Sequence, residues 1–407
     1  MTARIVTDAE RRHRLGRRHA IAPAHRVSTP EQAADAVVVL HATEASTVYL
    51  SVAARTDGVS PADVDRALYD DRSLVKQLAM RRTLFVFPRD LLPAAWGSAS
   101  ARVAAAERRR VARNVEDDGR AEDGGRWLNE VGAQVEDLLA ARGTLSAKEI
   151  REALPVVDGK VAVSSTSPWG GPVPIAPRVL ALLGASARLT RGRNAGPWRI
   201  NRPAWTLMRT WLGELPEPWP AQEGYAELVR RWLRRFGPGT EADLVWWLGS
   251  TKTAVRQALA DVGAVEVGLE SGGTGAAHGS RTGSTGWLLP DDVEREPELE
   301  PWAALLPTLD PTTMGWRDRD FYLDPEHTSY LFDSNGNGGT TVWWDGRIVG
   351  CWVQDPDAVV VPVLREDIGS DGAAAVATEA ERLTEWLGGE VISSVYSSWQ
   401  MKQAMLP

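Results

Sequence analysis

The chain has 407 residues, of which 43% are hydrophobic and 25% charged, as in an ordinary protein of two to four domains. No run approaches the about 18 apolar residues that cross a bilayer, and residues 1–20 lack the apolar segment of a secretory signal. Cys351 is the only cysteine, which excludes an internal disulfide or a cysteine-rich zinc site. We therefore expect a cytoplasmic protein.

The net charge of −8 argues at first against a nucleic-acid ligand, but the charge is unevenly distributed. Residues 1–120 carry 20 Lys+Arg against 15 Asp+Glu, whereas residues 287–407 carry 7 against 22. DNA affinity depends on a local basic face rather than on the global sum. The first two thirds of the chain can therefore still bind DNA.

The first 118 residues predict three helices followed by a strand. Helices are expected over 30–41, 60–70 and 73–81, and the β-rich run 83–88 ends at a proline, as strands often do. This order is the one expected of a winged helix, and we take 1–118 as the first such domain.

The pattern recurs in residues 119–215. A helix is expected over 124–140, and Ser146 with Glu149 forms a capping-box pattern before a second short helix. Residues 179–193 are expected to run from a helix into a strand, with a partner strand at the following Pro-Trp-Arg-Ile. This segment predicts a second winged helix.

Residues 216–292 predict the third copy most clearly. Thr240 and Gly249 are the expected N-cap and C′ residue of one helix, and 250–263 reads as the next helix. The Gly/Ser-rich stretch 271–286 is expected to be a long wing or flexible loop. Three copies suggest an extended concave surface, although any one copy could serve only as scaffold.

Residues 293–407 predict a different, β-rich domain. Asp345 and Gly346 lie between apolar runs, which is a hairpin signal. A closing helix is expected over 377–388 and a last strand over 391–398. The domain is expected to be barrel-like, and the whole chain falls in the α+β class.

Three segments carry a family resemblance: RFGPGTEADLVWWLGSTKTAVRQAL, LLPTLDPTTMGWRDRDFYLD and VWWDGRIVGCWVQ. Together they resemble the AlkZ/YcaQ-like winged-helix DNA glycosylases, over nearly the whole chain. The resemblance implies tandem winged helices in a C-shaped array with a C-terminal β-barrel. It also implies excision of cationic N-alkylpurines and of some bulky or crosslinking adducts.

The family's catalytic motif, usually Gln-x-Gln or Gln-x-Asp, falls here on His41, Ala42 and Thr43, so both polar positions depart from the common pattern. An N7-alkylated purine is already a cationic leaving group, so the enzyme must chiefly aim a water at C1′ and stabilise a cationic sugar. A neutral His41 can accept a proton from that water, Thr43 can orient it, and the neighbouring Glu44 could orient His41 or stabilise the sugar.

A plainer interpretation of the motif also exists. His41 could cap the C-terminus of its helix, where an imidazolium suits the helix dipole, and Thr43 would then begin the next turn. The lysine nearest in sequence is Lys76, so hydrolysis is favoured over a Schiff-base mechanism.

Several polar residues are candidates for contacts with DNA, each with an ion-pair or solvated alternative. The candidates are Arg55, Arg81, Arg82, Lys252 and Thr253. The Gly-Trp-Arg-Asp-Arg-Asp run at 315–320 is interpreted as structural, and most tryptophans as core residues.

Together these features predict a monofunctional glycosylase that releases N7-alkylated or bulky genotoxin-adducted purines from duplex DNA, in base excision repair or antibiotic self-resistance. We expect a monomer at the nucleoid, with no cofactor and no metal. The alternative is a non-catalytic winged-helix regulator or damage sensor. A nuclease is a third, remote option, because no metal-like cluster of histidines and acids stands out.

Overall fold

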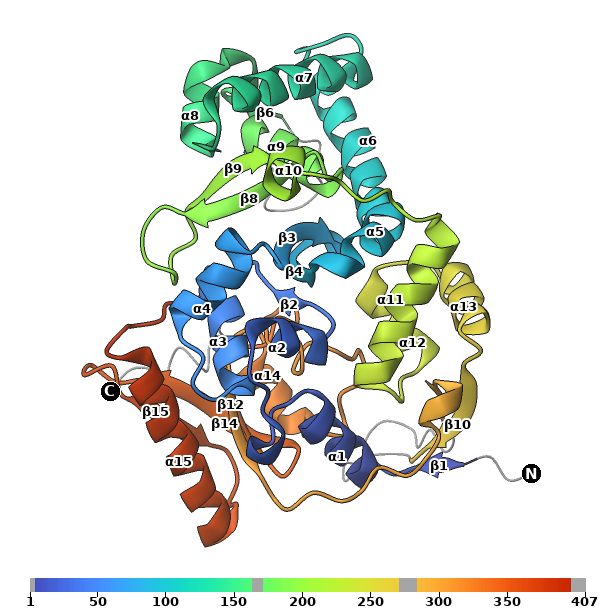
Figure 1. Ribbon diagram of the computed structural model, residues 1–407, viewed down its shortest axis with the longest axis vertical. Helices are drawn as coiled ribbons and strands as arrows, with labels where there is room; N and C mark the ends of the chain where they lie inside the picture. Colours follow the sequence, from blue (N-terminus) through green and yellow to red (C-terminus); the bar gives the residue numbers. More distant parts are fainter. Residues whose placement is uncertain (1–3, 163–170, 271–283, 397–407) are drawn as a thin grey trace.

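The computed structural model describes residues 4–162, 171–270 and 284–396 (Figure 1). Within these ranges three units repeat one order of elements: a helix, a short strand, two further helices and a two-stranded hairpin. In the first two units the short strand pairs with the last strand of the hairpin. In the third, this strand is reduced to one bridge between Gly239 and Trp287.

The first unit is built around a sheet in the order β2-β4-β3. Thr29 caps its first helix by accepting a hydrogen bond from the backbone N–H of Gln32, and Ser60 with Asp63 forms a capping box on its third. Its elements are α2 (Pro30–Ala36), β2 (Leu40–His41), α3 (Ala45–Arg55), α4 (Pro61–Asp65), β3 (Leu74–Ala79) and β4 (Thr83–Pro88).

Two expectations for this unit are wrong. The helix expected over 30–41 ends at Ala36, and His41 lies on β2 rather than at a helix terminus, which removes its predicted capping role. The helix expected over 73–81 is strand β3, whose side chains are buried on both faces. A strand buried on both faces lacks the polar–apolar alternation by which strands are recognised in sequence.

A helical connection leads to the second unit, which has its own hydrophobic core. The core extends from Val111 on α6 to Leu207 on β9, and the predicted capping box of Ser146 and Glu149 is present. The connecting helices are α5 (Leu92–Ala95) and α6 (Ala101–Asp117). The unit contains α7 (Gly124–Arg142), β5 (Leu145–Ser146), α8 (Ala147–Ala153), β6 (Lys160–Val161), β7 (Val173–Pro174), α9 (Ile175–Ala185), β8 (Leu189–Asn194), β9 (Pro203–Leu207) and α10 (Met208–Leu212). The partner strand expected at 197–200 begins instead at Pro203.

The third unit confirms the expected caps, since Thr240 forms a capping box with Asp243 and Gly249 ends its helix in a left-handed conformation. Its elements are α11 (Ala221–Phe236), α12 (Glu241–Leu248), α13 (Lys252–Asp261), β10 (Val265–Leu269) and β11 (Ser284–Leu288). Most of the stretch expected to form a flexible wing lies outside the described residues.

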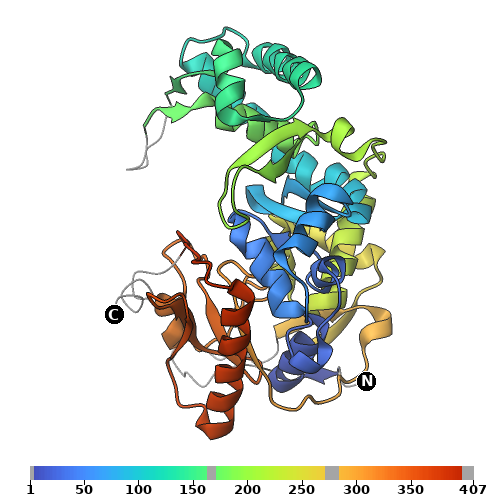
Figure 2. The same ribbon diagram turned by 60° about the vertical axis from the view of Figure 1, so that its left-hand side comes forward.

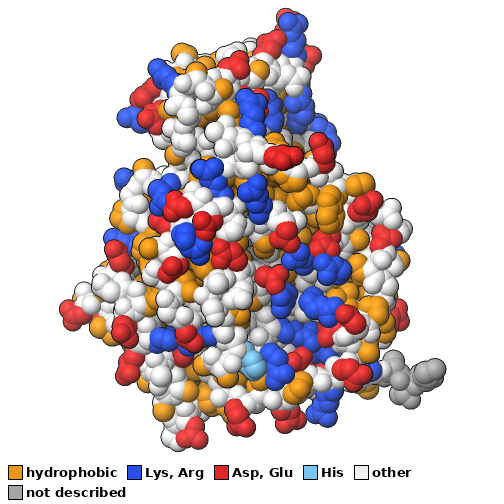
Figure 3. All heavy atoms as spheres, in the orientation of Figure 1, with side chains coloured by type: hydrophobic (Ala, Val, Ile, Leu, Met, Phe, Trp, Pro, Cys, Tyr) orange, Lys and Arg blue, Asp and Glu red, His pale blue; other side chains and the backbone are white. Residues whose placement is uncertain are grey.

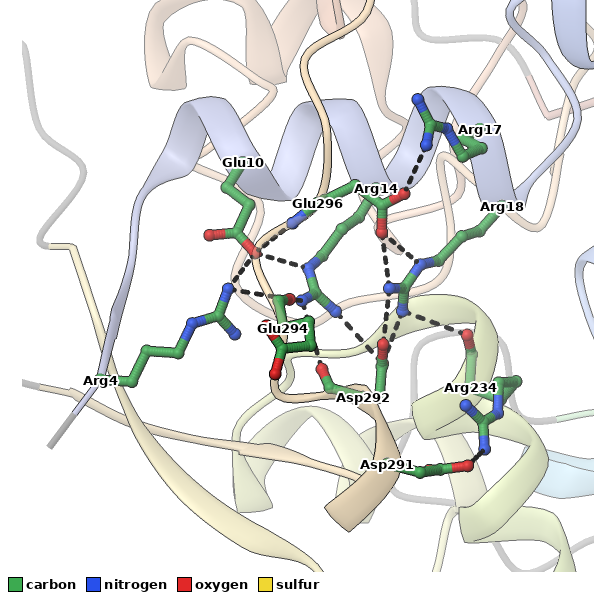
Figure 4. A network of polar contacts seen from close by, with 10 residues as sticks. All are labelled: Arg4, Glu10, Arg14, Arg17, Arg18, Arg234, Asp291, Asp292, Glu294 and Glu296. Atoms are coloured by element: carbon green, nitrogen blue, oxygen red, sulfur yellow. Dashed lines mark hydrogen bonds and ion pairs between the residues drawn. The ribbon is translucent and has the colours of Figure 1, made fainter.

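The N-terminal segment packs on this third unit rather than on the first. Strand β1 (Ile5–Val6) pairs in parallel with β10, and α1 (Asp8–Arg18) follows it. An ion-pair network joins α1 to the segment after β11 (Figure 4). In it, Arg18 contacts both Asp292 and Glu296 at 2.7 Å, and Arg14 contacts Glu10 at 2.9 Å.

The C-terminal region is an open four-stranded antiparallel sheet, not the predicted barrel, because β12 and β15 do not pair with each other. The Asp345–Gly346 hairpin is confirmed between β13 and β14. The elements are β12 (Ala303–Leu306), α14 (Thr328–Leu331), β13 (Thr341–Trp344), β14 (Arg347–Gln354), β15 (Val360–Leu364) and α15 (Gly369–Leu387). The described part of the strand expected at 391–398 is irregular.

The second unit stands at one end of the molecule, and the C-terminal sheet with α15 lies at the other (Figures 1 and 2). One core unites the first unit, the third unit, α1 and much of the C-terminal region. Among the described residues, no helix is both long and apolar enough to cross a membrane.

Candidate active site

His41 is fixed at the end of β2 by the sheet of the first unit. The backbone N–H of the next residue, Ala42, donates to the carbonyl of Leu84 at 2.9 Å, and His41 lies opposite Phe85 on β4. The two rings meet edge to face with centroids 5.4 Å apart. Only 7% of His41 is exposed, so the imidazole has a defined position beside α3.

The surroundings of His41 keep its ring neutral. Burial lowers its pKa to about 3, and the positive charge of Arg81 acts in the same direction against a weaker opposing effect of Asp310. The backbone N–H of Thr43 donates to Nδ1 at 3.4 Å, which assigns the ring proton to Nε2. An imidazole of this kind is a hydrogen-bond donor through Nε2 and a weak base.

Thr43 lies in the turn between β2 and α3 and is half-buried. Its carbonyl accepts a hydrogen bond at 3.1 Å from the side chain of Asn201, which belongs to the β8–β9 loop of the second unit. Two units therefore meet at the motif.

Glu44 follows as the N-cap residue of α3, but its carboxylate does not cap the helix. It accepts hydrogen bonds from the hydroxyl of Ser394 at 3.1 Å and from the backbone N–H of Val395 at 2.8 Å. Burial raises the pKa of Glu44. Its carboxylate thus holds the C-terminal segment and makes no hydrogen bond to His41.

Arg55 does not fit its expected role as a phosphate contact. It is fully buried, and its guanidinium binds both carboxylate oxygens of Asp310, at 2.7 and 2.8 Å, and the hydroxyl of Thr312 at 2.7 Å. Ser51 donates to the same carboxylate at 2.7 Å. Arg55 therefore anchors α3 to the C-terminal region and does not reach DNA.

Arg81 and Arg82 lie in the turn between β3 and β4. Both have a left-handed backbone, with φ of 52° and 60°. The side chain of Arg82 is half exposed and lies 3.4 Å from Glu107, whereas Arg81 stacks on Trp246 of α12 at 3.9 Å. The turn of the first unit therefore contacts the third unit.

Lys252 and Thr253 are the first residues of α13 and are exposed. Thr251 caps the helix, so these side chains stand at its N-terminus. Arg81 lies against Gly249, which ends the preceding helix: a Cβ at Gly249 would come within 3.0 Å of Arg81. Arg81 thus contacts α12, the helix that precedes Lys252, whereas Arg55 is buried against the C-terminal region.

Lys76 is the lysine nearest to the motif in sequence, but it lies on the other face of the sheet. It pairs with Val86, and the neighbouring row pairs Phe85 with His41. Its ammonium donates to the hydroxyl of Tyr69 at 2.7 Å, and burial lowers its pKa to about 7.

Three residues of the site were not found from sequence. Asp310 holds Arg55, the carbonyl of Thr308 accepts from the hydroxyl of Thr47 at 2.9 Å, and Asn201 binds Thr43. The Thr-Leu-Asp-Pro-Thr-Thr run at 308–313, part of one of the segments that carry the resemblance, is a signal for the first two. Nothing in the sequence around Asn201 indicates its contact.

Fold and sequence comparisons together define a class, the DNA glycosylases. The chain belongs to the AlkZ-like DNA glycosylase family, which matches residues 34–386. The solved structure of DNA glycosylase AlkZ from Streptomyces sahachiroi is similar with a TM-score of 0.71 and 21% identity, covering 95% of this chain and 97% of that one. The same organism has a curated relative named an interstrand DNA cross-link repair glycosylase, 28% identical over 180 residues. That match spans 41% of this chain and 44% of the relative, less than half of its length.

Proposed function

We propose that this chain is a monofunctional DNA glycosylase that hydrolyses the N-glycosidic bond of N7-alkylated or bulky-adduct purines in duplex DNA. Repair of alkylated bases and self-resistance to a genotoxin are the roles that this activity would serve. The observation that carries the proposal is the placement of His41 and Thr43 in one rigid turn beside the cationic hairpin. The names of the relatives support the same class of reaction.

The repeated topology supports DNA as the ligand. Each unit has the helix, strand and hairpin order of a winged helix, and we propose 1–118, 119–215 and 216–292 as winged-helix domains with 293–407 as the C-terminal domain. The exposed Arg82, Lys252 and Thr253 are proposed to contact the duplex. The protein is proposed to act as a monomer on chromosomal DNA.

Hydrolysis of this bond needs little help from a general base. A cationic purine leaves readily, so the residues need only hold a water in position to attack C1′. We assign the Nε2–H of His41 to donate to that water and the hydroxyl of Thr43 to accept its hydrogen bond. As the bond from C1′ to the purine breaks, the neutral alkylated base leaves with the bonding electrons, and the proton that the attacking water loses passes to solvent. Since Lys76 occupies the opposite face of the sheet, release by hydrolysis is favoured over strand cleavage through a Schiff base.

Base release from a duplex containing one N7-methylguanine or one genotoxin adduct tests the proposal. Abasic product, revealed as strand breaks only after alkali, is expected with the full chain and is expected to fall at least 100-fold in His41→Ala. His25→Ala, which removes a half-buried histidine elsewhere, is the matched control. Binding to the duplex without base release from any adduct would favour the non-catalytic alternative and refute the glycosylase proposal.

A further inference from the structure

Two guanidinium groups share one indole ring where the first unit, the third unit and the C-terminal region meet. The Cζ atom of Arg81 lies 3.9 Å from the ring centroid of Trp246, and that of Arg319 lies 5.5 Å from the same ring. Arg319 also stacks on Phe332 at 4.5 Å. All of Arg81, Trp246 and Arg319 are half-buried, so part of each side chain remains open to a ligand.

These two cations lie close enough for their charges to repel each other. Burial and the charge of Arg319 lower the pKa of Arg81 to about 10, with no carboxylate among the causes. The Nε of Arg81 is buried without a partner among the described residues. Arg319 donates from Nε to the carbonyl of Trp316 at 3.2 Å, a neutral acceptor.

The chain as a whole carries a net charge of −8. Arg14 and Arg18 of α1, by contrast, are matched with acids in the network that they form with Glu10, Asp292 and Glu296 (Figure 4). On the face shown in Figure 3, basic and acidic side chains are interspersed. Two stacked guanidiniums left beside each other repel, and an oxyanion between them would remove that repulsion.

The backbone around Arg81 also holds the pair in place. A left-handed backbone at a residue other than glycine is strained, and it persists where the surroundings fix it. Here the hairpin turn lies directly against Gly249, whose carbonyl accepts from the side chain of Arg102 at 3.2 Å. A third, exposed arginine therefore stands next to the stacked pair.

We propose that Arg81, Trp246 and Arg319 form a clamp for one backbone phosphate of the DNA strand that carries the damaged base. The planar guanidiniums can each donate two hydrogen bonds to phosphate oxygens while they stay stacked on the indole. Because His41 pairs with Phe85 on β4, the strand that follows Arg81 in the hairpin, the bound DNA strand would pass beside the motif. This inference rests on the proposed DNA ligand, but not on base release.

The test is the salt dependence of binding to an undamaged fluorescent duplex, measured with the full chain. The plot of log K against log[NaCl] has a negative slope, and each lost phosphate contact makes that slope shallower by about 0.9. We expect this change in Arg319→Gln and in Arg81→Gly, and no change in the control Arg126→Gln, an exposed α7 arginine paired with Glu130. Arg81→Gly also relieves the left-handed backbone, so it is expected to fold if Arg319→Gln does not.

The arms of the experiment separate the possible outcomes. Unchanged slopes in folded Arg81→Gly would overturn the clamp. Stabilisation of the wild type by inorganic phosphate, lost in Arg81→Gly while the DNA slope stays constant, would identify a free-anion site and would also overturn it. Reduced slopes together with no base release from damaged duplexes by the wild type would support the clamp and refute the glycosylase.

Discussion

His41 is held as a neutral donor, and this has a consequence for the pH profile of base release. Because burial and Arg81 keep its pKa near 3, no protonation of His41 occurs between pH 5 and 8 in the free enzyme. A general base with an ordinary histidine pKa of about 6.5 would instead give an acid limb in that range. The two roles are therefore distinguishable by kinetics.

The variant His41→Gln separates them further. A glutamine amide keeps an N–H donor at the same place, so we expect base release within about tenfold of wild type and a flat profile between pH 5 and 8, whereas His41→Ala loses the donor. The measurement is single-turnover release of N7-methylguanine. An acid limb in the wild type that is absent from His41→Gln would show that His41 acts as a base.

Folding stability has a matching pH dependence. The pKa of His41 falls from 6.5 in the unfolded chain to about 3 in the fold, so the unfolded chain takes up the proton first as the pH drops. Stability from this residue is present above about pH 6.5 and is lost toward pH 3. His41→Gln removes that part of the acid sensitivity.

At the same scale, sequence located the motif but not the environment of its residues. His41 and Thr43 were found through the family resemblance. Arg55 was misassigned because its partner, Asp310, is 255 residues away in the chain. No local sequence pattern shows whether an arginine contacts a phosphate or a distant buried carboxylate. An arginine in the last turn of a helix, such as Arg55, is compatible with either.

Helix α3 is held by its buried ion pair, and this predicts an effect on stability. Asp310→Asn leaves the fully buried Arg55 guanidinium without its counter-ion, which we expect to cost about 3 kcal/mol or more of unfolding free energy. Asp57→Asn is the control, because Asp57 is 67% exposed in its pair with Arg26 and such pairs contribute less than about 1 kcal/mol. Urea unfolding measures both, and equal losses in the two variants would contradict the assignment.

Among the secondary-structure elements, helices whose ends carry capping residues were predicted best. The capping box of Ser146 with Glu149 and the N-cap Thr240 were predicted correctly, because a side chain three residues from its partner is a local signal. The strand β3 was missed, and the closed barrel was wrong, because burial on both faces and the pairing of sheet edges depend on segments distant in sequence.

For the whole molecule, the β8–β9 loop connects the second unit to the candidate site. Trp198 in this loop packs between Tyr49 of α3 and Trp386 of α15, with ring centroids 5.0 and 5.6 Å apart, and the loop carries the Asn201 that binds Thr43. Most hydrophobic residues of the second unit form a separate core, and the unit also contacts the first unit where Thr190 donates to the carbonyl of Lys76 at 2.8 Å. The loop therefore couples its position to the geometry of the motif.

Trp198→Ala tests this coupling. Removal of a partly buried tryptophan is expected to lower the local opening free energy by about 2 kcal/mol, so that backbone amides of residues 195–202 and of the first turn of α3 exchange about 30-fold faster. Amides in the core of the second unit should keep their protection, because that core does not include Trp198. Trp219→Ala, which removes a tryptophan that is 39% exposed, is the control. The packing of Trp198 against Tyr49 predicts faster exchange in α3 together with slower base release. If exchange rises only within the loop and α3 stays protected, the loop does not determine the geometry of the site, and base release should be unaffected.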